Sequence, residues 1–194
     1  MPSRRDFVRG TLGTGVLLAA APAAFARQPL EDVYAQVAAG HEAAIVRLQD
    51  WIRQITIAAE NRGMEDGCRY MMQLARDAGF QHVERIQTGG FPSVFATLDA
   101  GAKRTIGVYF MYDVKQVDPA EWSSPPWDAR LVELPGLGKA VMGRGAVNQK
   151  GPQASFLSAL HAIHAAGRKP PVNLVLIAES EEEIGSPHFA DAVL

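Results

Sequence analysis

The spacing of apolar residues predicts two helical regions in the first half of the chain. Residues 30 to about 60 contain no proline, and their apolar side chains recur at steps of three and four: Ile45, Leu48, Ile52 and Ile55. This is the spacing of one buried helical face. A second helix is predicted over residues 64–78, ending at Gly79, because glycine favours the left-handed conformation that closes a helix.

Apolar runs without helical spacing predict strands. Residues 83–88 and 94–98 are separated by Gly-Gly-Phe-Pro, which predicts two neighbouring strands. The continuous apolar runs at 105–111 and 172–178 predict buried strands, and we expect the first of them to be central and covered on both faces. A helix is predicted over 152–166, after a long irregular stretch at 114–144.

This order of strand, loop, helix and strand predicts an α/β sheet with right-handed crossovers. In such sheets functional residues gather at the carboxyl ends of the strands. Asp113 follows the first apolar run, and Glu181, Glu182 and Glu183 follow the second. Three adjacent carboxylates either bind a cation or form a solvated acidic helix start, and both interpretations stay open at this point.

Composition narrows the choice of partners. The 194 residues carry 19 Lys and Arg against 21 Asp and Glu, a formal net charge of −2. Without a basic excess, nucleic acid is not an expected partner. A single cysteine excludes an intrachain disulfide and a multi-cysteine zinc site.

The first 26 residues have the three parts of a signal peptide. Ser-Arg-Arg-Asp-Phe at 3–7 precedes an uncharged stretch at 10–25 and the small-x-small sequence at 24–26. Paired arginines before phenylalanine indicate twin-arginine export, with cleavage after Ala26. The apolar stretch is too short and too diluted to span a bilayer. We therefore expect a periplasmic or cell-envelope protein without a stable membrane anchor after cleavage.

Several motifs in fixed order resemble a known family: Tyr-Asp-Val at 112–114, Val-Asp-Pro at 117–119, Ser-Pro-Pro-Trp at 124–127, Gly-Arg-Gly-Ala at 143–146 and Glu-Glu-Ile-Gly-Ser at 182–186. The pattern is similar to that of the di-zinc aminoacylases and carboxypeptidases, which include acetylornithine deacetylase, succinyl-diaminopimelate desuccinylase, glutamate carboxypeptidase and carnosinase-type dipeptidases. The dipeptidase branch is the most similar.

The resemblance implies a fold and a domain plan. The fold is a three-layer α/β/α mixed sheet of the zinc-exopeptidase type, of which residues 27–194 would be the N-terminal part of the catalytic domain. Further strands, later metal ligands and a lid or dimerisation domain would lie beyond Leu194, and a homodimer is compatible with that plan. We expect the isolated fragment to be inactive and to expose an unpaired sheet edge.

The resemblance also assigns roles. Glu182 would be the general base, Glu183 a ligand of zinc or another divalent metal, and Asp113 the carboxylate that orients a neighbouring ligand. The family's first histidine ligand falls on Met111 and its bridging acidic ligand on Asn148. A thioether is a soft neutral donor, and an amide lacks the charge with which a carboxylate bridges two cations. Without a histidine at 111, Asp113 could contact Arg144, Lys150 or substrate, or have no catalytic role.

These expectations lead to two functional hypotheses. The first is an exported metal-dependent hydrolase, mononuclear or with an alternative metal, that cleaves an amide bond of a small peptide or N-acyl amino acid. The second is a non-catalytic peptide-binding or inactive relative that has lost its metal ligands at Met111 and Asn148.

Overall fold

The computed structural model describes residues 29–193, and the predicted signal peptide at 1–26 lies outside them. Four strands form a mixed sheet in the order β1-β2-β6-β3. The bounds are β1 His82–Ile86, β2 Ser93–Leu98, β6 Asn173–Glu179 and β3 Thr105–Met111. β2 pairs antiparallel with β1 and β6, whereas β3 and β6 are parallel. The predicted mixed α/β sheet is confirmed.

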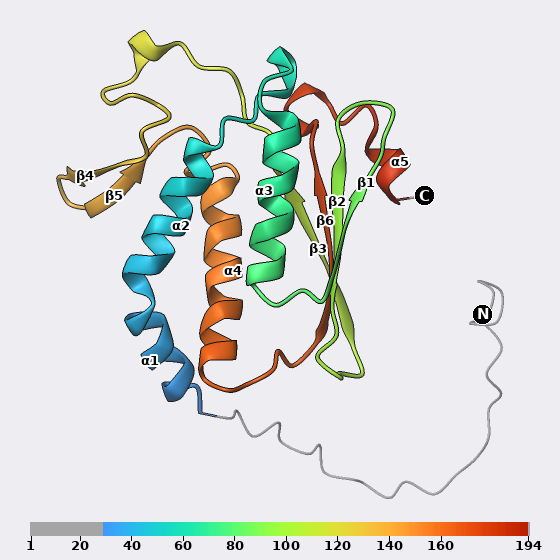
Figure 1. The fold of residues 1–194 in the computed structure, drawn as a ribbon. Helices are drawn as coiled ribbons and strands as arrows, with labels where there is room; N and C mark the ends of the chain where they lie inside the picture. The colour runs from blue at the N-terminus through green and yellow to red at the C-terminus, as the bar shows by residue number, and fades with distance from the viewer. Residues whose placement is uncertain (1–28, 194) are drawn as a thin grey trace, which may run out of the picture.

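The long helices gather on one face of this sheet (Figure 1). They are α1 Glu31–Ala39, α2 His41–Arg53, α3 Met64–Asp77 and α4 Lys150–Ala165. Among the described residues, the other face is contacted by one short helix, α5 Phe189–Val193. The helices α1 to α4, the sheet and α5 thus correspond to the three expected layers. Of the third layer, α5 is the part that lies within the described residues. Within residues 29–193, no helix is long and apolar enough to cross a bilayer.

The core lies between the helices and the sheet. The face of α3 that packs on the strands consists of residues spaced three and four apart, namely Met64, Cys68, Met71 and Ala75. The sheet contributes fully buried positions such as Val94 and Leu176. Amphipathic spacing directs these side chains inward. The helix predicted over 64–78 agrees with α3, Met64–Asp77, to within one residue.

Two predictions about the sheet region are wrong. β3 is not central: β6 takes that place, and β3 lies at the edge of the described sheet, with Ile106 and Tyr109 50% and 42% exposed. The stretch at 114–144 is not all irregular, because it contains the antiparallel hairpin of β4 Arg130–Leu134 and β5 Gly138–Met142. In addition, the first predicted helical region, residues 30 to about 60, is divided at Gly40 into α1 and α2 and ends at Arg53, so Ile55 lies outside it.

Candidate active site

The candidate site lies where β3 and β6 end. The two strands are parallel and in register, so that Met111 is opposite Glu179. The segments that leave them therefore start at the same edge of the sheet, and Asp113 meets the glutamate run at 181–183 as expected.

Asp113 is completely buried and holds the backbone of the glutamate run. Its two carboxylate oxygens accept hydrogen bonds from the N–H groups of Glu182, at 3.2 Å, and Glu183, at 3.0 Å. Burial raises the pKa of Asp113 to about 7, although these two hydrogen bonds act in the opposite direction. Asp113 thus fixes the turn that presents the next two carboxylates.

The three glutamates have three different environments. Glu181 is buried, and its Oε2 atom lies 2.8 Å from Nδ1 of His188. Glu182 is exposed at the start of the 3-10 turn Glu182–Ile184. Glu183 has a side chain only 11% exposed. The run is therefore not a uniformly solvated acidic helix start, and Glu182 is the one of the three that is open to solvent.

Glu183 is in contact with two donors from other segments. Nδ2 of Asn148 lies 3.4 Å from Oε1 of Glu183, and Nζ of Lys115 lies 3.5 Å from Oε2. The structure thus brings together two of the positions expected to bind metal. No pattern in the sequence indicates Lys115, because its contact with Glu183 depends on the path of the chain after β3.

Met111 belongs to a buried polar network rather than to a cluster of ligands. It is 3% exposed, its N–H donates to Oε1 of Gln149 at 3.2 Å, and its carbonyl accepts from Nε2 of Gln153. Gln153 in turn accepts from the indole of Trp51 at 2.9 Å. Within residues 29–193, no three His, Cys, Asp or Glu side chains are arranged to hold a metal ion.

Neither of the two basic residues considered as partners of Asp113 pairs with it. Lys150 is fully buried, and its ammonium donates to the carbonyl oxygens of Trp51, at 3.1 Å, and Gln54. Burial lowers the pKa of Lys150 to about 7. Arg144 donates to the carbonyl of Gln116 at 3.1 Å. The partners of Asp113 are backbone N–H groups instead.

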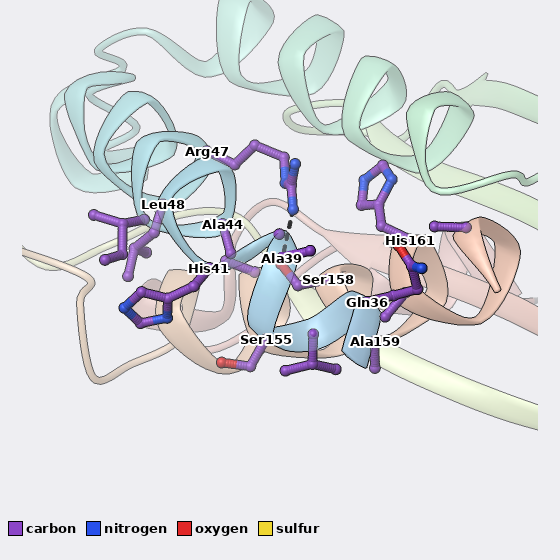
Figure 2. A pocket seen from close by; sticks show the side chains of 16 residues that line it. Gln36, Ala39, His41, Ala44, Arg47, Leu48, Ser155, Ser158, Ala159 and His161 are labelled. Carbon is purple, nitrogen blue, oxygen red and sulfur yellow. Dashed lines mark hydrogen bonds between the residues drawn. The ribbon is translucent and has the colours of Figure 1, made fainter. Parts of the chain in front are cut away.

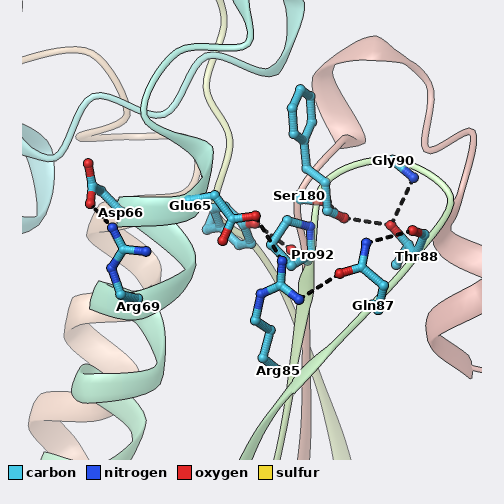
Figure 3. Close-up of polar contacts among 11 residues, drawn as sticks. Glu65, Asp66, Arg69, Arg85, Gln87, Thr88, Gly90, Pro92 and Ser180 are labelled. Carbon is cyan, nitrogen blue, oxygen red and sulfur yellow. Dashed lines mark hydrogen bonds and ion pairs between the residues drawn. The ribbon is translucent and has the colours of Figure 1, made fainter.

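The turn between β1 and β2 lies beside Ser180, the residue that precedes the glutamate run (Figure 3). The hydroxyls of Ser180, at 2.9 Å, and Thr88 both donate to the carbonyl of Phe91. A Cβ atom on Gly90 would lie 2.3 Å from Oε1 of Glu181 and 2.4 Å from Nδ1 of His188. The turn therefore packs on Glu181 so closely that a Cβ atom at position 90 would displace the Glu181 carboxylate or the His188 ring.

Two hollows differ in their chemistry. The larger, about 580 Å³, lies between α1, α2 and α4, where Arg47 donates to Ser158 at 3.3 Å (Figure 2). None of the site residues expected from the sequence lines it. The smaller, about 380 Å³, is lined by Ala59, Val114, Lys115, Gln116 and Glu183. The candidate chemistry is therefore at the smaller hollow.

Residues 109–194, which include Asp113, Glu182 and Glu183, match the family model "Peptidase family M20/M25/M40". Over these residues the chain is similar to this peptidase family. The expected family resemblance is confirmed. The match begins in β3 and includes β6, so the family region contains both strands whose ends carry the site.

Proteins similar to this chain include named dipeptidases. It is 27% identical over 135 residues to the Cys-Gly metallodipeptidase DUG1 of Saccharomyces cerevisiae, covering 62% of the chain and 27% of the relative. It is 31% identical over 121 residues to human Beta-Ala-His dipeptidase, and this match covers 60% of the chain and 23% of that dipeptidase.

The structural match agrees with these relatives. The M20 family metallo-carboxypeptidase Sso-CP2 of Sulfolobus solfataricus is 29% identical with a TM-score of 0.69, covering 77% of the chain and 33% of that structure. The chain thus spans 27% of the length of DUG1 and 33% of that of Sso-CP2.

Proposed function

We propose that this protein is an exported, metal-dependent hydrolase that cleaves an amide bond of a small peptide or an N-acyl amino acid. The observation that carries the proposal is the placement of Glu182, within the M20 family region, on a turn whose backbone is held by Asp113. The dipeptidase names of two relatives support a small peptide as substrate.

Glu182 is suited to move a proton. Its carboxylate is exposed at the carboxyl end of β6, whereas its own N–H is bound to buried Asp113. An exposed carboxylate on a fixed backbone, adjacent in sequence to Glu183 at the smaller hollow, would accept the proton of an attacking water and transfer it to the departing amine. Asp113 is a positioning residue in this scheme, because it touches the backbone of the turn rather than the substrate.

Similarity to the family implies a divalent metal, which when bound would polarise the amide carbonyl as a Lewis acid. Glu183 is the carboxylate that the family resemblance assigns as a metal ligand, and the neighbouring Asn148 side chain is neutral. Met111 and Asn148, in place of a histidine and an acidic residue, do not fit a two-zinc centre. Proton transfer and positioning are therefore assigned to the chain's own residues, Glu182 and Asp113.

Export is the second part of the proposal and rests on the twin-arginine pattern in residues 1–26. Cell fractionation with and without replacement of Arg4 and Arg5 by lysine tests it. We expect the wild-type product in the periplasm or envelope and the variant in the cytoplasm. Equal distribution of the two would contradict the export proposal.

The activity is tested with the complete gene product and a panel of dipeptides and N-acetyl amino acids. We expect release of free amino acid from at least one substrate, loss of turnover with a chelator, and recovery when a divalent metal is restored. Peptide binding without any turnover would instead support the non-catalytic hypothesis. Turnover that a chelator leaves unchanged would contradict the metal dependence.

A further inference from the structure

Both carboxylate oxygens of Glu183 face a nitrogen donor from the chain itself. Oε1 faces the amide nitrogen of Asn148 at 3.4 Å, and Oε2 faces the ammonium of Lys115 at 3.5 Å. A carboxylate that is a metal ligand directs an oxygen at a cation, and the family's bridging carboxylate would lie beside it at position 148. Here an ammonium and the neutral amide of Asn148 face the two oxygens of Glu183.

Asp113 and Met111 do not add metal donors beside Glu183. The two oxygens of Asp113 are engaged by backbone N–H groups. Met111 is neutral and buried beside the network of Gln149 and Gln153. The charged side chains that line the smaller hollow are thus the carboxylate of Glu183 and the ammonium of Lys115, which form an ion pair.

Lys115 is available to more than its ion pair. Its side chain is 67% exposed, whereas that of Glu183 is 11% exposed. Both side chains line the hollow of about 380 Å³, which falls in the size range of small-ligand sites. An exposed ion pair contributes little to stability, so retention of the fold does not depend on it. An ammonium at the wall of such a hollow can donate a hydrogen bond to a carbonyl oxygen and stabilise the negative charge that develops on it.

We propose that Lys115 provides, beside Glu183, the positive charge that a second metal ion would otherwise supply, and that the protein binds no more than one metal ion per chain. This inference rests on the proposed amide hydrolysis. In that reaction Lys115 contacts the substrate carbonyl oxygen through its ammonium, forms no covalent bond, and keeps its protons throughout. Glu182 remains the group that accepts the proton of water.

The first test counts metal and does not depend on activity. The complete gene product is loaded with zinc, freed of excess metal by gel filtration and analysed by plasma mass spectrometry. We expect at most one equivalent for the wild-type protein. The triple variant Met111→His, Asn148→Asp, Lys115→Gln restores a histidine and an acidic residue and removes the ammonium, and we expect it to gain about one equivalent. Two equivalents in the wild-type protein would overturn the proposal.

The second test uses turnover of the best substrate in the panel. We expect Lys115→Gln to lower kcat at least tenfold and Lys115→Arg, which keeps the charge, to retain most of it. Lys139→Gln, at an exposed position of β5, is the matched control and should leave kcat unchanged. A Lys115→Gln variant with kcat within twofold of wild type would overturn the proposal. If the wild-type protein has no turnover at all, the proposed function fails. The number of bound metal ions still tests whether Lys115 takes the place of a second metal ion.

Discussion

Asp113 acts on the main chain rather than on another side chain. Its carboxylate receives the N–H groups of two consecutive residues, Glu182 and Glu183, and so determines where both of their side chains start. The sequence placed Asp113 and the glutamates at the same edge of the sheet correctly. It could not identify the partners of Asp113. Arg144 and Lys150 are candidates because of their positive charge, whereas the actual donors are uncharged backbone N–H groups, which no side-chain pattern indicates.

Replacing Asp113 with asparagine tests this role. Asparagine offers one oxygen in place of two, so one of the two N–H groups would face an amide donor in a buried place. We expect a loss of about 1–3 kcal/mol in the free energy of unfolding and a lower kcat. Chemical denaturation and the peptide assay measure the two effects. Asp77→Asn, at an exposed position of α3, is the control. Unchanged stability and activity in Asp113→Asn would contradict the positioning role.

Cys68 provides a test of the core at the level of one side chain. It is fully buried on α3, and burial raises the pKa of its thiol from 9.0 to about 11. Between these two pH values the unfolded chain has released the proton and the folded chain keeps it, so folding stability should fall as the pH rises through this range. We expect slow alkylation by iodoacetamide in the native protein below pH 9 and rapid alkylation in denaturant. Equal rates in both states would show that α3 is not packed as described.

At the scale of elements, the helices were easier to predict than the strands. α3 shows its buried face in the spacing of Met71, Leu74 and Ala75, and its observed end is one residue from the predicted end. β3 is as apolar as a central strand, yet it pairs only with β6 among the described strands. Apolar content indicates a strand, but strand order depends on long-range pairing that a local pattern does not encode. The hairpin of β4 and β5 was missed, although alternating apolar residues and a Pro-Gly pair indicate it.

The turn between β1 and β2 allows a direct test of packing between elements. In Gly90→Ala the new Cβ atom would lie 2.3 Å from Oε1 of Glu181, so the turn or the Glu181–His188 pair must move. We expect a loss of about 1–3 kcal/mol, measured by chemical denaturation. Gly107→Ala in β3 is the matched control, since a Cβ atom there would meet nothing within 4 Å. Equal stability of the two variants would contradict the close approach of the turn to Glu181.

At the scale of the whole molecule, the sheet and its helical layer place Glu182, Glu183 and Asp113 on one edge, next to a hollow where Lys115 also lies. The sequence predicted this edge because two parallel strands end there. It did not predict Lys115, because the contact joins residues 68 positions apart through irregular segments. The export signal and the metal requirement remain predictions at this scale.

The most direct test of the central claim is the turnover number of Glu182→Gln on the best dipeptide or N-acyl amino acid substrate. Glutamine keeps the shape of the side chain but cannot accept the proton of water. The account predicts that kcat falls about 10²- to 10⁴-fold, while Glu133→Gln, at an exposed position of β4, stays at the wild-type value. A Glu182→Gln variant that is correctly folded and within twofold of wild type would contradict the account.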